Sequence, residues 1–167
     1  METLELARRL ISIPSYVGKD CNEQKIAEFL CEYLKQFNWL EIKKQKVVEN
    51  RFNIIAQDKF PTQLLISGHL DTVLPKTGWQ TDPFKPVTQK GKLFGLGSSD
   101  MKGSLAALIN CLNYFKSTRG LMILLYIDEE YDFLGMKKFI QEYKNKIKPD
   151  YVVSGDGYDL KLGNGCR

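Results

Sequence analysis

Residues 64–73 read LLISGHLDTV, an apolar run that passes into a polar turn and contains the only histidine of the 167-residue chain. The apolar run predicts a short buried strand over residues 63–66. In extended backbone, side chains two positions apart point to the same side, so we expect His69 and Asp71 to face one cleft. An imidazole beside a carboxylate is typical of a metal ligand and the group that orients it. The alternative is a histidine at a strand end, followed by an ordinary polar turn.

The composition is that of an ordinary globular protein of one domain. Apolar residues make up 43% and charged residues 26% of the chain, and a chain of this length buries roughly 70% of its extended surface on folding. No apolar run approaches the ~20 residues that a bilayer-spanning helix needs. The acidic, amphipathic residues 1–6 do not resemble a secretory signal. We therefore expect a cytoplasmic protein that has no membrane partner.

The charges, cysteines and glycines exclude several other classes of site. The net charge is +4, and the lysines are scattered without interleaved aromatic residues, which favours a solvated surface over a nucleic-acid interface. The four cysteines form no C-x-x-C pair, so we expect reduced thiols. Gly95 and Gly97 lack the third glycine of a dinucleotide-binding fingerprint.

The apolar periodicity predicts helices that alternate with strands. The predicted helices cover residues 4–11, 22–37, 104–115 and 133–143, and the predicted strands cover residues 40–48, 52–56, 63–66, 121–127 and 151–153. The first two strands are expected to form a hairpin, and residues 75–86 a long irregular loop. This pattern favours an α/β fold with a mixed, mostly parallel sheet and helices on both faces.

The polar residues that could carry chemistry fall at strand ends and at one helix start. In open α/β sheets, ligands bind beyond the carboxyl ends of the strands. His69 with Asp100, Glu130 and Asp156 would form the mixed nitrogen and oxygen set that zinc and related divalent ions accept. Since adjacent side chains diverge, Glu129 and Glu130 can take different roles, one at the metal and one in proton transfer. Taken singly, each acidic residue could also be a helix cap, a turn residue or a solvated strand end.

Three motifs resemble the M20 metallopeptidases, a family that includes acetylornithine deacetylases, succinyl-diaminopimelate desuccinylases and carboxypeptidase G2 types. The motifs are SGHLDTV at 67–73, GKLFGLGSSDMKG at 91–103 and DEE at 128–130, together with Trp79 and the Pro83-Phe84 pair. The resemblance implies a zinc-exopeptidase-like catalytic fold that hydrolyses the amide bond of N-acyl amino acids or small peptides. It also implies two zinc ions, with Co²⁺ or Mn²⁺ as substitutes, which activate water and polarise the carbonyl.

The resemblance assigns a role to each candidate site residue. Its metal ligands would be His69, Asp100, Glu130 and Asp156, with Asp100 bridging the two ions. Asp71 and Glu129 would be the catalytic residues, with Asp71 holding His69 in place and Glu129 acting as the general base. The resemblance also implies a cis peptide bond between Asp100 and Met101.

In the family, a lid or dimerisation domain follows the strand that carries Asp156, and a second histidine ligand lies near the far terminus. We therefore expect residues 1–167 to be the N-terminal part of an M20-like catalytic domain, without the lid or dimerisation domain and without the C-terminal part of the catalytic domain. Such a part should bind at most one metal ion tightly, be inactive alone and expose apolar surface that favours homo-oligomers. Two alternatives stay open: a non-catalytic remnant that binds at most a single metal, and a different dinuclear aminopeptidase clan with the same core.

Overall fold

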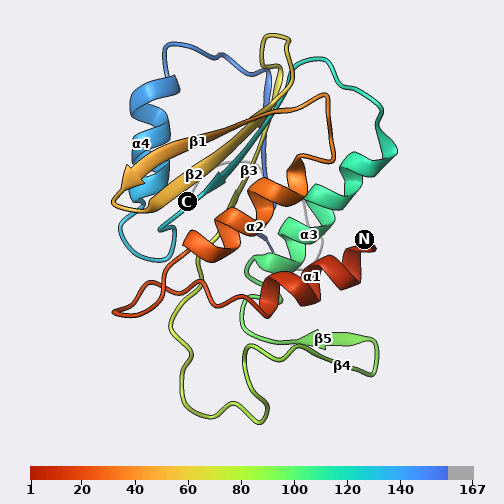
Figure 1. Cartoon of the computed structure of the whole chain (residues 1–167), viewed down its shortest axis with the longest axis vertical. Helices are drawn as coiled ribbons and strands as arrows, with labels where there is room; N and C mark the ends of the chain where they lie inside the picture. The colour runs from red at the N-terminus through yellow and green to blue at the C-terminus, as the bar shows by residue number, and fades with distance from the viewer. Residues whose placement is uncertain (158–167) are drawn as a thin grey trace.

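The computed structural model describes residues 1–157 as a sheet with helices on both faces (Figure 1). The helices are α1 (Thr3–Ile11), α2 (Gln24–Leu34), α3 (Lys102–Cys111) and α4 (Leu134–Tyr143), with a short 3-10 helix at Leu112–Tyr114. The strands are β1 (Glu41–Val48), β2 (Arg51–Gln57), β3 (Leu64–His69), β4 (Val87–Gln89), β5 (Lys92–Phe94), β6 (Leu121–Tyr126) and β7 (Tyr151–Ser154). The predicted α/β fold is confirmed. Within this part of the chain, every helix is too short or too polar to cross a lipid bilayer.

Five strands form the main sheet in the order β1-β2-β6-β3-β7. β1 and β2 form the predicted hairpin, and β2 runs antiparallel to β6. β6 and β7 both run parallel to β3. The prediction of a mixed sheet is confirmed, but parallel pairs are two of its four pairings rather than most of them. The reason is that the hairpin joins the sheet antiparallel, at the side of β6.

Apolar side chains from β6 enter the cores on both faces of the sheet. α1, α2 and α3 cover one face and α4 covers the other (Figure 1). β6 is buried along its whole length, because its side chains alternate between the two cores. Ile123 and Leu125 pack in the core of α1–α3, whereas Leu124 and Tyr126 pack in the core of α4. A strand buried on both faces explains the unbroken apolar run in its sequence.

The bounds of β3 and α3 differ from the prediction for physical reasons. β3 continues past position 66 to His69, because Ser67, Gly68 and His69 extend the parallel ladder with β6. His69 is therefore the last residue of a strand. The helix predicted over 104–115 begins earlier, at Lys102, and its predicted last turn is a 3-10 helix followed by extended backbone at Phe115. Leu112 is buried at the start of this turn, whereas Tyr114 and Phe115 are 85% and 50% exposed, so the core does not hold the end of the turn in the helix.

The sequence did not predict the hairpin of β4 and β5. Lys90 and Gly91 join the two strands with φ values of 50° and 72°, which suit the tight turn of a two-residue hairpin. Each strand has three residues and is largely exposed, so no apolar alternation marks it in the sequence. Figure 1 shows this hairpin and the preceding loop beyond the end of β3, away from the main sheet.

β7 exposes apolar side chains at an edge of the sheet. Within the described residues it pairs with β3 alone, and Tyr151, Val152 and Val153 are 72%, 63% and 44% exposed. Because unpaired apolar edges promote association, we expect the chain to self-associate at high concentration. Val152→Lys should shift this equilibrium toward the monomer in sedimentation velocity, whereas the control Ile140→Lys, on the exposed face of α4, should not. A wild-type chain that stays monomeric at high concentration would contradict this prediction.

Candidate metal centre

The carboxyl ends of β3, β6 and β7 bring the predicted site residues together. His69 ends β3, Glu129 and Glu130 lie in the turn after β6, and Asp156 follows β7. Asp100 reaches the same place from the segment that precedes α3. The sequence predicted this convergence because the carboxyl ends of parallel strands lie at one edge of a sheet.

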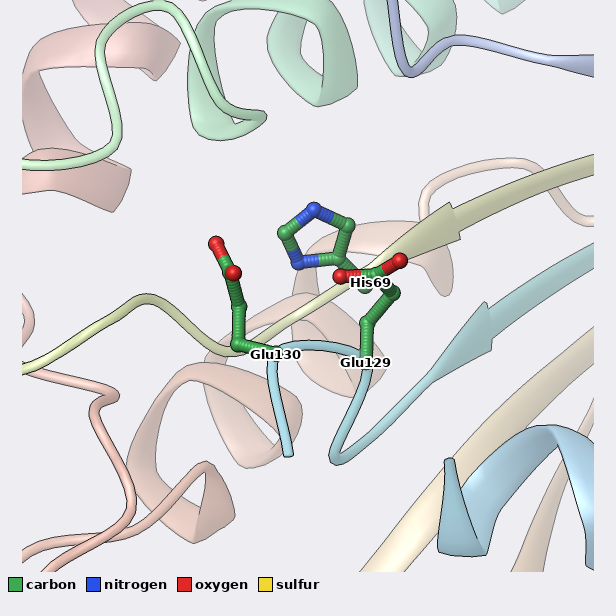
Figure 2. A group of neighbouring side chains, drawn as sticks. All are labelled: His69, Glu129 and Glu130. Atoms are coloured by element: carbon green, nitrogen blue, oxygen red, sulfur yellow. The ribbon is translucent and has the colours of Figure 1, made fainter. Parts of the chain in front are cut away.

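Two groups of candidate ligands share the imidazole of His69. One ligand atom from each of His69, Glu129 and Glu130 lies within 4.8 Å of the others, and the same holds for His69, Asp100 and Asp156. Figure 2 shows the two glutamates leaving adjacent positions of the turn, with both carboxylates beside the imidazole. The histidine is buried, whereas Asp100 and Asp156 are exposed. One nitrogen donor and several oxygen donors at such separations suit a divalent metal ion.

Both ring nitrogens of His69 have polar partners. Nδ1 donates to the main-chain oxygen of Asp71 at 3.1 Å and lies 3.5 Å from its carboxylate Oδ1, while Nε2 lies 2.8 Å from Oδ1 of Asp100. Burial lowers the pKa of His69, but the contacts with Asp100 and Asp71 outweigh burial and raise it to about 10. His69 therefore carries a proton at neutral pH, and a metal ion must displace that proton to bind the ring.

Asp71 holds the turn that carries Glu129 and Glu130, here called the glutamate turn, as well as the histidine. Its side chain is fully buried. Its carboxylate accepts the main-chain N–H of Glu129 at 3.0 Å and that of Glu130 at 2.9 Å. The sequence predicted the contact with His69. It carried no signal for the two bonds to the turn, because they join segments that only the folded sheet brings together.

The electrostatics of the site favour a bound cation. Burial is the main cause that raises the pKa of Glu129 and of Glu130, and the neighbouring carboxylates add to it, whereas His69 opposes it. Asp71 and Asp100 are among these neighbours for both glutamates. A divalent cation among the carboxylates would offset the excess of negative charge, since opposite charges stabilise the ionised form.

The peptide bond between Asp100 and Met101 is cis, as predicted. Met101 is buried, and its sulfur accepts the main-chain N–H of His69 at 3.1 Å. A Cβ atom on Gly68 would lie 2.8 Å from Cε of Met101 and 2.7 Å from Cδ2 of Leu105. Glycine at position 68 therefore allows the end of β3 to approach α3 closely, so that Asp100 lies beside the imidazole.

A cleft of about 280 Å³ opens beside Asp100 and Glu130. Trp79 and residues 95–99 form much of its wall. A larger cavity of about 390 Å³ lies between Trp79 and Phe94, but no candidate metal ligand lines it. Of these two cavities, the smaller cleft is therefore the one that reaches candidate metal ligands.

Comparisons with known proteins point to one family. The sequence model of peptidase family M20/M25/M40 matches residues 65–166. The succinyl-diaminopimelate desuccinylase of Nautilia profundicola is 35% identical over 158 residues, which cover 92% of this chain and 41% of that protein. The acetylornithine deacetylase of Proteus mirabilis is 37% identical over 170 residues, which cover 95% of this chain and 43% of that protein.

The fold has a counterpart among solved structures. The crystal structure of human carnosine dipeptidase 1 matches with a TM-score of 0.82 at 19% identity, over 93% of this chain and 38% of that one. At this identity the likeness shows the fold alone. The chain spans less than half the length of each of the three proteins.

Proposed function

Because the chain belongs to peptidase family M20/M25/M40, we propose that it carries metal-binding residues of a hydrolase that cleaves the amide bond of N-acyl amino acids or small peptides. Two of its relatives are named as a desuccinylase and a deacetylase. The single observation that carries the proposal is that His69 belongs to two groups of candidate ligands. The family assignment removes the alternative of a different dinuclear aminopeptidase clan.

The donor set fits a site for two divalent ions, with zinc as the proposed metal and Co²⁺ or Mn²⁺ as substitutes. His69, Asp100 and Asp156, whose ligand atoms lie together, would hold one ion with the three protein ligands that a catalytic zinc normally has. Asp100 would also bind the second ion, with Glu130. When bound, the metals would lower the pKa of a coordinated water and polarise the substrate carbonyl.

Glu129 is the residue that we propose to move the proton. Its carboxylate lies beside His69, and burial raises its pKa toward the working pH of a general base. It would take a proton from the attacking water and deliver that proton to the leaving nitrogen. Asp71 supports this step, because it holds the main chain of Glu129 and the ring of His69.

The proposed second ion would have few ligands within this chain. The chain contains one histidine, so that ion would keep only Asp100 and Glu130, fewer protein ligands than catalytic zinc sites normally have. We therefore infer that residues 1–167 are the N-terminal part of a longer catalytic unit. We expect this part alone to bind one ion tightly and to hydrolyse N-acyl amino acids negligibly. The same histidine count favours a second candidate, a single-metal domain without hydrolase activity, and the length of the natural gene product distinguishes the two.

Glu129→Gln and Glu130→Gln should separate the two proposed glutamate roles. In the natural gene product that contains this chain, Glu129→Gln should keep its metal and lose about 100- to 10,000-fold in hydrolysis rate, because a general base contributes that much. Glu130→Gln should instead weaken metal binding. The measurements are metal content and hydrolysis of acetylornithine and succinyl-diaminopimelate, with Glu28→Gln on the exposed face of α2 as a control. Equal metal loss in both variants would overturn the roles, and a metal-loaded gene product that hydrolyses no N-acyl amino acid or peptide would overturn the proposed activity.

We also propose a cytoplasmic location. The cysteines within the described residues, Cys21, Cys31 and Cys111, form no disulfide. Free thiols are typical of reducing compartments. Fractionation of cells with an antibody to the chain would test this location.

A further inference from the structure

A buried ionic network lies beneath the turn that carries Glu129 and Glu130. Arg51 opens β2 and donates to both carboxylate oxygens of Glu23, through Nε at 2.8 Å and through Nη2 at 2.6 Å. Nη2 also donates to Oδ1 of Asp128 at 2.5 Å. The side chains of Glu23 and Asp128 are 0% and 3% exposed, and that of Arg51 is 13% exposed. The network therefore joins the residue before α2, the start of β2 and the segment after β6.

Asp128 links this network to the glutamate turn. It precedes Glu129 directly, and its φ of 68° lies in the left-handed region, which a residue other than glycine keeps only where its surroundings hold it. Its main-chain N–H donates to Oε1 of Glu23 at 3.0 Å. Its carboxylate Oδ2 accepts the main-chain N–H of Asp132 at 3.1 Å. Asp128 is thus bonded both to the network below and to the chain beyond the two glutamates.

The turn is therefore held from two sides. Asp71 accepts the main-chain N–H groups of Glu129 and Glu130, whereas Glu23 and Arg51 bond to Asp128. These holding groups include three buried carboxylates, and the guanidinium contacts two of them. Loss of the guanidinium would leave buried carboxylates without their cation, which is costly unless the chain rearranges or a carboxylate takes up a proton.

We propose that Arg51 is a positioning residue of the metal centre, which acts through Glu23 and Asp128 to fix the turn that presents Glu129 and Glu130 to His69. Its fork of donors bonds to two carboxylates at once, a geometry that the single ammonium of lysine does not reproduce. The effect on metal binding rests on the proposed function. The ordering of the turn does not, so the two are tested separately.

The variants are Arg51→Met and Arg51→Lys, with Asp58→Asn as the matched control. Asp58 is also buried, and it accepts the main-chain N–H of Leu121 at 2.9 Å and the hydroxyl of Thr118 at 2.7 Å, at the opposite end of β6. Asp58→Asn therefore weakens the hydrogen bonds of a comparable buried carboxylate and leaves the glutamate turn unchanged. Arg51→Lys keeps the positive charge and provides a second variant where Arg51→Met does not fold.

Two measurements on the chain test the ordering of the turn and the binding of metal separately. Hydrogen exchange of the main-chain amides of Glu129 and Glu130 should be about tenfold faster in both Arg51 variants and unchanged in the control, because their bonds to Asp71 open more often. Titration with Co²⁺ should show about 10- to 100-fold weaker binding and an altered visible spectrum in the Arg51 variants. The carboxylate of Asp71 is bonded to the turn and lies beside the ring of His69, so a loosened turn would disturb the group that orients this metal ligand, and loss of such a group usually costs that much. The control should match the wild type in both properties of the Co²⁺ complex.

The outcomes separate the positioning role from a merely structural one. Unchanged exchange in the Arg51 variants, or exchange that is equally faster in Asp58→Asn, would overturn the proposal. Faster exchange in the Arg51 variants alone, with wild-type Co²⁺ affinity and spectrum, would also overturn the role at the metal centre. If the wild-type chain binds no Co²⁺, the proposed metal site fails, while faster exchange confined to the Arg51 variants still supports the ordering of the turn by Arg51.

Discussion

His69→Ala should abolish tight binding of a divalent metal ion by this chain. His69 is the only histidine in the sequence, it is buried, and both groups of candidate ligands include it. Without the imidazole, each group keeps two carboxylates, fewer than the three protein ligands of a typical catalytic zinc site. The affinity should fall by more than about 100-fold, since loss of a group that merely orients a ligand already costs 10- to 100-fold.

Isothermal titration with Zn²⁺ would measure this loss. Leu70→Val is the matched control, because it shortens the buried neighbour of His69 and leaves every candidate ligand in place. We expect the control to bind Zn²⁺ like the wild type and His69→Ala to show no tight binding, with both variants folded by circular dichroism. Wild-type affinity in a folded His69→Ala chain would contradict the proposed site.

Asp71→Asn should weaken both metal binding and folding. The carboxylate of Asp71 accepts two main-chain N–H groups from the glutamate turn, and an asparagine amide would have to oppose one of these donors with its own NH₂ group. We expect a loss of about 1–3 kcal/mol in the free energy of unfolding, because a buried donor is left without an acceptor. Metal affinity should fall about 10- to 100-fold, because the groups that orient His69 and the glutamates are disturbed.

Asp58→Asn separates the two effects of this change, because Asp58 is also buried and also accepts main-chain N–H groups, far from the metal centre. It should lower the free energy of unfolding by a similar amount and leave Zn²⁺ affinity unchanged. Equal losses of metal affinity in Asp71→Asn and Asp58→Asn would show that the effect of Asp71 is one of general stability.

The pKa of Asp71 makes the effect of Asp71→Asn on the free energy of unfolding depend on pH. Burial alone would raise that pKa, but the contact with His69 and the N–H groups of Glu130 and Glu129 outweigh burial and lower it. A carboxyl group with a lowered folded-state pKa stabilises the fold above its unfolded-state pKa, about 3.9, and loses that contribution as the pH falls through the folded-state value. The difference in unfolding free energy between wild type and Asp71→Asn should therefore shrink as the pH is lowered below about 4. Urea unfolding across this range measures the difference, and one that stays constant would contradict the assignment.

The sequence predicted the outline of the site because the outline follows from local rules. The alternation of helices and strands places His69, the glutamate pair and Asp156 at strand ends, and parallel strands bring those ends together. Neither β4 nor β5 was predictable in this way, since three exposed residues carry no apolar period. The predominance of parallel pairs was also overestimated, because the sequence does not reveal which side of β6 the hairpin joins.

The groups that hold the site together could not be predicted from the sequence. Glu23, Arg51 and Asp128 lie in three separate segments. Glu23 and Arg51 look like ordinary charged residues at the end of an element, and Asp128 belongs to the DEE motif, which gives no sign of its bonds to the other two. Their bonds exist only because α2, β2 and β6 pack side by side. Buried ionic networks of this kind depend on tertiary packing. Hydrophobic periodicity and secondary-structure propensity do not encode that packing.

Metal analysis of the dialysed chain tests the central claim most directly. The wild-type chain and His69→Ala would be loaded with Zn²⁺, dialysed against metal-free buffer and analysed by atomic absorption. We predict one retained zinc ion per wild-type chain, held by His69, Asp100 and Asp156, and none in the variant. No retained zinc in the wild type, or the same amount in the variant, would contradict a metal centre built on His69, and two ions per wild-type chain would contradict the proposed ligand count.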